Sequence, residues 1–154
     1  MYKRQLLELV ATVLAERGCE GFIFRGDDGL DEISLSTTST VYQINKGEIS
    51  KEIFDPSELG LERVGIEELR GGSPGENADI TRAIFAGRGG AYRQAVLLNA
   101  AAAIAAFKAD FHLGLTQQLA NGYTLAKQAV DSGAAAQLVE RWANLSTELA
   151  KSSL

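Results

Sequence analysis

The sequence predicts an α/β fold: a partial parallel sheet with an antiparallel hairpin, packed by a carboxyl-terminal set of helices. Three observations support this prediction. An amphipathic helical pattern over residues 3–17 is followed closely by the apolar run Phe22-Ile23-Phe24. Segments rich in β-branched residues at 40–44 and 48–54 flank an Asn-Lys-Gly turn, and helical patterns occupy nearly everything after residue 76.

The first helix and the first strand form the αβ half of an α/β unit. Apolar residues recur at helical spacing and charged residues fill the other side; the apolar set is Leu6, Leu7, Val10, Val13 and Leu14. Gly18 is a suitable C-terminal stop for this helix. Because no polar residue interrupts Phe22-Ile23-Phe24, we expect a strand covered on both faces, as in a parallel sheet.

The second half of the chain is predicted to be helical. The hairpin ends at Asp55-Pro56, because a proline cannot join a strand ladder. Helices are expected from about 76 to 86 and from about 91 to 108, and the alanine-rich second one should be buried on most sides. Two further helices carry apolar stripes, formed by Leu115, Leu119, Gly122, Ala126 and Val130 in one and by Leu138, Trp142, Leu145 and Leu149 in the other. We expect Trp142 to lie in the core.

Length and composition place limits on the function. The 154 residues are predicted to form a single domain, residues 1–154. A net charge of -5 argues against a nucleic-acid partner, because binding phosphates requires a basic face. No apolar run approaches the roughly 20 residues of a membrane span, so no membrane partner is expected and the cytoplasm is the predicted location.

The most distinctive stretch runs from Gly26 to Ser34 and places four carboxylates in six positions: Asp27, Asp28, Asp31 and Glu32. Like charges held close together repel, so either water or a cation must compensate them. The stretch follows a strand, and open α/β sheets bind ligands beyond the carboxyl ends of their strands. From the residues alone, a solvated acidic turn and a site for a hard cation such as Mg²⁺ both stay open.

Several short sequence motifs, in this order and at similar spacing, resemble those of the anthranilate phosphoribosyltransferase family. They are Gly26-Asp27-Asp28-Gly29-Leu30-Asp31-Glu32-Ile33-Ser34, Asp55-Pro56 with Leu59-Gly60-Leu61, Glu76-Asn77-Ala78, Leu97-Leu98-Asn99-Ala100-Ala101 and Asp131-Ser132-Gly133. The resemblance covers residues 2 to about 149. It corresponds to the carboxyl-terminal half of the family's catalytic α/β domain, and the first phrase is the most specific.

The resemblance implies a function and a metal site. In that family the Asp-Glu pair of the Leu-Asp-Glu-Ile-Ser motif binds Mg²⁺ beside the pyrophosphate, which assigns Mg²⁺ to Asp31 and Glu32 and leaves Asp27 and Asp28 as solvated neighbours. The implied reaction is transfer of phosphoribose from phosphoribosyl pyrophosphate to anthranilate, in tryptophan biosynthesis. No catalytic residue and no other cofactor-binding residue is assigned, because the family's remaining motifs lie upstream of the position that matches Met1.

The resemblance also implies that this chain does not act alone. We expect it to be inactive without the missing amino-terminal half, and the edges of the strand at Phe22-Ile23-Phe24 to favour instability or self-association, with a homo-oligomer possible. Whether Met1 is a natural start stays open. The alternative is a non-catalytic binding or assembly module that keeps the fold. A phosphorylase-like enzyme with another acceptor is a weaker alternative, against which the Asp-Glu-Ile-Ser motif argues.

Overall fold

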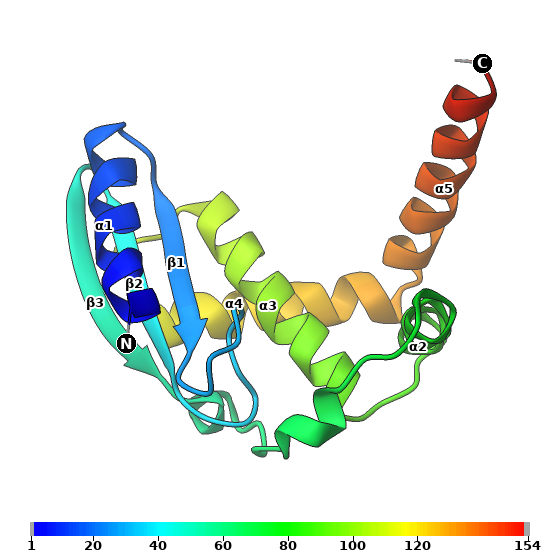
Figure 1. Ribbon diagram of the computed structural model, residues 1–154, viewed down its shortest axis with the longest axis horizontal. Helices are drawn as coiled ribbons and strands as arrows, with labels where there is room; N and C mark the ends of the chain where they lie inside the picture. Colours follow the sequence, from blue (N-terminus) through cyan, green and yellow to red (C-terminus); the bar gives the residue numbers. More distant parts are fainter. Residues whose placement is uncertain (1, 153–154) are drawn as a thin grey trace.

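The computed structural model describes the backbone of residues 2–152 and the side chains of residues 6–152. In chain order the elements are α1 (Tyr2–Glu16), β1 (Gly21–Gly26), β2 (Ser39–Asn45), β3 (Glu48–Phe54), the short 3-10 helices η1 (Pro56–Leu59) and η2 (Ile66–Leu69), α2 (Pro74–Phe85), α3 (Ala91–Lys108), α4 (Leu115–Asp131) and α5 (Ala134–Ser152). Figure 1 shows an open U, with α1 and the sheet in one arm and α5 in the other.

The three strands form an antiparallel sheet in the order β1-β2-β3. The predicted hairpin is confirmed: β2 pairs with β3, with Ile44 opposite Ile49, and Lys46 and Gly47 both have positive φ in the turn, as two-residue hairpins favour. The predicted parallel pairing is wrong for the described residues. β1 pairs antiparallel with β2, because the segment between them returns the chain beside β1 without a crossover helix.

The apolar run in β1 is explained by coverage on both faces of the antiparallel sheet, not by parallel pairing. Ile23 packs toward α1 with Tyr42 and Ile44, whereas Phe22 and Phe24 pack on the other face, against the main core. The strand is therefore covered on both faces, as expected, although its neighbour is antiparallel. Coverage by helices on both sides removes the alternation that a half-exposed strand would show.

The main core lies between the sheet and the paired helices α3 and α4. Fully buried side chains from the sheet and from both helices meet there, among them Phe54, Leu98 and Leu119. Gly122 of α4 lies directly against α3, since a Cβ at this position would come within 2.3 Å of the Ala101 carbonyl oxygen. The small residues of α3 thus permit a close helix pair, and the predicted burial of this helix is confirmed for Ala101, Ala102 and Ala105.

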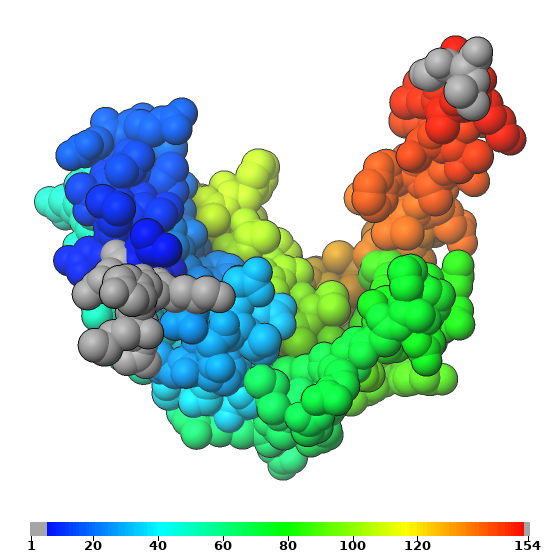
Figure 2. Space-filling view, in the orientation of Figure 1, coloured from blue at the N-terminus to red at the C-terminus, as the bar shows by residue number. Residues whose placement is uncertain are grey.

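Two helices bury less than their patterns predicted. In α1 the buried contacts are made by Ala11 and Ala15, while Leu6, Val10 and Val13 are exposed. Helix α5 has no buried residue, and its apolar seam faces solvent along the arm that projects in Figure 2. The prediction that Trp142 lies in the core is wrong, because its exposed fraction is 70%. Among the described residues, no helix combines the length and the hydropathy needed to cross a membrane.

Candidate functional site

The four carboxylates lie in the segment of residues 27–38 that joins β1 to β2, here called the acidic loop. Its backbone is closed by three hydrogen bonds. The Gly26 N–H donates to the Leu30 carbonyl (3.0 Å), the Gly29 N–H donates to the Gly26 carbonyl (3.0 Å), and the Asp27 N–H donates to the Thr38 carbonyl (2.9 Å). Gly29 has a φ of 106°, which a residue with a Cβ rarely adopts. The loop is therefore an ordered turn rather than a loose connection.

Asp28 organises the interior of the acidic loop. Its Oδ2 accepts hydrogen bonds from the hydroxyls of Ser34 and Ser36, and its Oδ1 accepts one from the Leu30 N–H at 3.1 Å. Partial burial acts to raise the pKa of Asp28, but the hydrogen bonds from Ser34, Ser36 and the backbone outweigh it and lower the pKa below its ordinary value. Asp28 is a structural carboxylate and not a merely solvated neighbour.

Asp27 likewise has a structural role at the base of the loop. Its Oδ2 accepts a hydrogen bond from the Thr38 hydroxyl (2.6 Å), and Thr40 Oγ1 lies 3.4 Å from its Oδ1. These contacts join the end of β1 to the start of β2. The expectation that Asp27 and Asp28 are solvated neighbours is therefore corrected by the hydroxyl groups around both side chains.

Asp31 and Glu32 differ from the other two acidic residues. Within residues 6–152 neither carboxylate accepts a hydrogen bond or joins an ion pair; Asp31 is exposed and Glu32 is half-buried. Burial raises the pKa of Glu32, and the charges of Asp31 and Asp28 raise it further. Two adjacent, uncompensated oxygen donors fit a hard cation chemically, and a positive charge there would relieve this repulsion.

This pair is not a complete metal cage. Within the described part of the chain, no group of three or more His, Cys, Asp or Glu side chains is placed to hold a metal ion. Asp28 instead accepts three hydrogen bonds from within the acidic loop. A Mg²⁺ ion commonly takes one or two carboxylates and completes its shell with water and substrate phosphates. The arrangement suits that kind of site.

Glu32 also lines a cavity of about 370 Å³ between the acidic loop, η2, α2 and α3. Its other lining residues are Leu69, Gly71, Asn77, Ile80, Thr81, Ile84, Tyr92, Ala95, Val96 and Asn99. Asn99 hydrogen-bonds to the backbone of Ile33, the residue after Glu32. The sequence identified Asn99 only as one residue of a family motif. Its amide among apolar helix residues was nevertheless a signal, because a polar group in such surroundings needs a hydrogen-bond partner elsewhere in the fold.

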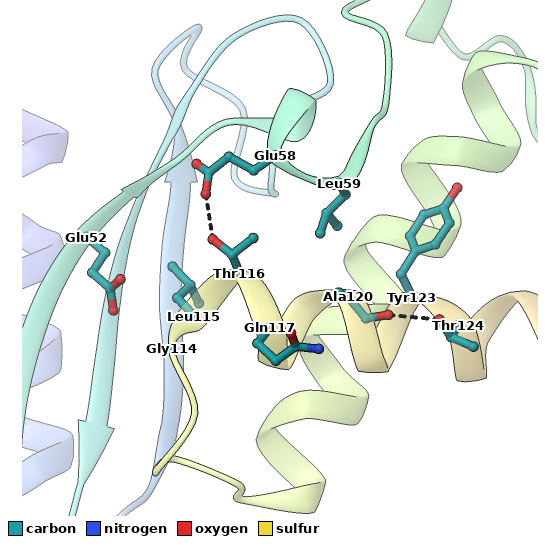
Figure 3. A pocket seen from close by; sticks show the side chains of 10 residues that line it. All are labelled: Glu52, Glu58, Leu59, Gly114, Leu115, Thr116, Gln117, Ala120, Tyr123 and Thr124. Atoms are coloured by element: carbon teal, nitrogen blue, oxygen red, sulfur yellow. Dashed lines mark hydrogen bonds between the residues drawn. The ribbon is translucent and has the colours of Figure 1, made fainter.

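A larger hollow, of about 670 Å³, lies elsewhere, between β3, η1 and α4 (Figure 3). Its rim is held by a hydrogen bond from the Thr116 hydroxyl to Glu58 (2.5 Å). Tyr123 and Leu59 line it further along α4 and η1. None of the residues predicted from the sequence to form a site lies in this hollow, so it does not extend the acidic pair.

Comparison with known proteins places the chain in a family. The model described as "Glycosyl transferase family, a/b domain" matches residues 1–136. The anthranilate phosphoribosyltransferase of Rhodococcus jostii (strain RHA1) is 50% identical over 147 residues, covering 96% of this chain and 41% of the relative. The enzyme of the same name from Thermobifida fusca (strain YX) is 45% identical over 152 residues, which are 43% of its length. The chain thus spans well under half the length of these relatives.

Solved structures agree with this placement. The anthranilate phosphoribosyltransferase of Thermus thermophilus matches with a TM-score of 0.75 and 32% identity, over 90% of this chain and 39% of that one. A variant of the Saccharomyces cerevisiae enzyme with Mg bound gives a TM-score of 0.76 and 26% identity, over 88% of this chain and 38% of that one. The resemblance seen in the sequence motifs is confirmed: this chain belongs to the glycosyl transferase family, in its a/b domain.

Proposed function

We propose that this chain supplies the metal-holding acidic pair of an anthranilate phosphoribosyltransferase, which transfers phosphoribose from phosphoribosyl pyrophosphate to anthranilate in tryptophan biosynthesis. The observation that carries the proposal is the contrast within the acidic loop. Asp28 accepts hydrogen bonds from two hydroxyl groups. Within residues 6–152, the carboxylates of Asp31 and Glu32 have no hydrogen-bond or ion-pair partner. The names of the relatives and the magnesium in related solved structures support the same assignment.

In this mechanism Asp31 and Glu32 would hold Mg²⁺, which supplies positive charge for the pyrophosphate that leaves the ribose. The carboxylates need to be ionised for this role. Burial raises the pKa of Glu32 and the neighbouring charges of Asp31 and Asp28 raise it further, and the ion's positive charge would oppose both effects. The two serine hydroxyls and Asp28 keep the loop ordered, so that the pair does not have to be assembled when substrate arrives. The chain's contribution is thus the placement of negative charge.

The remaining parts of the active site would come from the portion that the relatives have and this chain does not cover. Two exposed apolar faces favour packing against a further part of the protein. They are formed by Leu6, Val10 and Val13 on α1 and by the seam of α5. β1 also lies at one edge of the described sheet, where a further strand could pair. We expect the isolated chain to be inactive for this reason, and a separately supplied amino-terminal half to restore the reaction.

The test is reconstitution. The chain is co-expressed with the part of the Rhodococcus jostii relative that it does not cover, and formation of phosphoribosyl anthranilate is measured with and without Mg²⁺. Asp31→Asn with Glu32→Gln should lower the rate by at least about 100-fold. Asp79→Asn is the matched control, because Asp79 is an exposed carboxylate paired with Arg82. Full activity of the isolated chain, or an unchanged rate in the double variant, would contradict the proposal.

A second candidate is a non-catalytic assembly module that keeps the fold. The observation in its favour is α5, whose side chains Leu138, Trp142 and Leu145 line an open apolar hollow of about 510 Å³. Calorimetric titration with Mg²⁺ and phosphoribosyl pyrophosphate separates the two candidates. An assembly module should release no heat of binding and show unchanged stability, whereas an enzyme part should show binding that the Asp31→Asn, Glu32→Gln variant loses.

A further inference from the structure

Asn99 connects helix α3 to the acidic loop through the backbone of a single residue. Its Oδ1 accepts a hydrogen bond from the Ile33 N–H (2.9 Å), and its Nδ2 donates to the Ile33 carbonyl (3.1 Å). The same Nδ2 donates to the Ala95 carbonyl one helical turn earlier (3.1 Å). One amide group therefore holds both backbone polar groups of Ile33 and is itself fixed to its own helix.

The hydrogen bonds between Asn99 and Ile33 also restrict Glu32, because Ile33 is the next residue in the chain. The Ile33 nitrogen belongs to the peptide group that joins Glu32 to Ile33, so a hydrogen bond there fixes the peptide plane attached to the Glu32 Cα. On the other side, the Ile33 side chain is buried in the main core, with 1% of its surface exposed. The backbone next to Glu32, which lines the cavity, is thus held at two points.

Helix packing alone does not explain an asparagine here. The neighbours of Asn99 in the sequence are leucines and alanines that pack in the helical core, and asparagine is a weaker helix former than alanine. An amide in such surroundings is tolerated when its hydrogen bonds are satisfied, and three of them are. Two of these three hydrogen bonds are made with Ile33 of the acidic loop, and only one is made within α3.

We propose that Asn99 is a positioning residue for the metal-holding pair: it fixes the backbone beside Glu32 so that the Asp31 and Glu32 carboxylates stay together despite their mutual repulsion. This inference rests on the proposed function. Without the clamp, adjacent like charges would turn apart, and part of the binding energy of a cation would be used to bring them back. Groups that orient metal ligands in this way commonly change metal affinity by about 10-fold to 100-fold when they are removed.

The variants are chosen so that the helix survives. In Asn99→Ser the hydroxyl can bond to the Ala95 carbonyl of its own helix but is too short to hold Ile33, and Asn99→Ala removes all three contacts. Gln118→Ala is the matched control for lost stability. Gln118 is also a buried helical amide, but its partners are Gln43 and the Leu113 carbonyl, outside the acidic loop.

In the first experiment Mn²⁺ is titrated into the 154-residue chain, and binding is measured by the paramagnetic broadening of backbone amide signals. In the second, the hydrogen exchange rate of the Ile33 amide is measured without metal. Wild type should show broadening centred on residues 31–32. Both Asn99 variants should need about tenfold more Mn²⁺ for the same broadening, and their Ile33 amide should exchange at least about tenfold faster. Gln118→Ala should match wild type in both measurements.

The outcomes separate the inference from the proposed function. If Asp31→Asn with Glu32→Gln abolishes the broadening but the Asn99 variants keep wild-type Mn²⁺ binding, the positioning role is overturned and the metal assignment stands. Equal weakening by Gln118→Ala would also overturn it, because general destabilisation would then explain the effect. If wild type shows no broadening that depends on Asp31 and Glu32, the metal assignment fails and the inference fails with it.

Discussion

Helices α4 and α5 follow each other with Ser132 and Gly133 between them, and each carries a stripe of apolar side chains at helical spacing. In α4 the stripe is buried against α3 and the sheet, with Leu119 only 1% exposed. In α5 the corresponding seam is open, and Leu145 is 54% exposed. Periodicity predicts which face of a helix is apolar, but it does not say whether the partner of that face lies in the same chain.

The composition of the two stripes reflects this difference. The α4 stripe includes Gly122 and Ala126, small residues that allow α3 to approach closely. The α5 seam consists of large side chains, and Leu138, Trp142 and Leu145 are each more than half exposed. A surface of this kind on a folded chain usually marks an interaction site. The difference between α4 and α5 can be measured by comparing matched substitutions in the two helices.

The first prediction compares two leucines. Leu119→Ala should lower the free energy of unfolding by about 2–5 kcal/mol, because it leaves a cavity in the main core. Leu145→Ala, the matched change in α5, should change it by no more than about 0.5 kcal/mol. Urea unfolding followed by circular dichroism measures both. Equal losses would mean that α5 is packed in the isolated chain.

The second prediction tests the close contact between α3 and α4. Gly122→Ala should cost about 3 kcal/mol, because the added Cβ would lie 2.3 Å from the Ala101 carbonyl oxygen and neither backbone can move freely. Gly75→Ala in α2 is the control, since nothing lies within 4 Å of a Cβ there. That control should be neutral or slightly stabilising, as alanine favours a helix. A neutral Gly122→Ala would show that the helices are farther apart.

The third prediction concerns the last residue of α4. Arg93 of α3 is buried; its guanidinium pairs with Asp131 and donates to the Ile84 carbonyl (3.3 Å). Arg93→Met should lower the Tm by a few degrees, less than Gly122→Ala does. Arg82→Met is the control, because its ion pair with Asp79 is exposed on both sides. An unchanged Tm for Arg93→Met would show that the end of α4 is not held by this pair.

The same pair predicts a pH dependence. The hydrogen bond from Lys127 lowers the pKa of Asp131; burial opposes this, and Arg93 lowers the pKa further. Because the pKa is lower in the folded state, the stabilisation is present above the ordinary carboxyl pKa of about 3.9 and is lost as the pH falls through the lowered value. The Tm difference between wild type and Arg93→Met should therefore narrow on acidification. If the Tm difference widens as the pH falls, the Asp131 carboxylate does not stabilise the fold through Arg93.

Much of the local structure could be predicted because its causes are local. The turn at Lys46 and Gly47 sets the hairpin register through residues next to it in the sequence. The direction of β1 could not be predicted in this way. An apolar run such as Phe22-Ile23-Phe24 indicates coverage on both faces, and here α1 and the main core supply that coverage around an antiparallel strand.

The candidate site shows the same limit. Asp31 and Glu32 were found from a motif, and their metal role stays a prediction. The structural roles of Asp27 and Asp28 were missed, although Ser34, Ser36 and Thr38 supplied hydroxyl partners only a few residues away. Asn99 lies 66 residues from Ile33 in the sequence. A contact over that separation depends on the packing of α3, which no local pattern contains.

The smallest effect on stability, and the most direct probe of α5, comes from Trp142. It is the chain's single tryptophan and is 70% exposed, so its fluorescence reports on α5 alone. Trp142→Ser should change the free energy of unfolding of the isolated chain by no more than about 0.5 kcal/mol. In the folded wild type, the emission maximum and the quenching by acrylamide should be close to those of the urea-unfolded chain.

Adding the amino-terminal half of the Rhodococcus jostii relative should shift this emission to the blue and protect it from acrylamide, if the seam of α5 is where that half packs. Dilution provides the control, because self-association would give a shift that depends on chain concentration without the added half. A blue-shifted, protected tryptophan in the dilute isolated chain would remove the distinction between α4 and α5. The open seam would then be closed by the chain itself, and α1 and β1 would be left as the surfaces available to a partner.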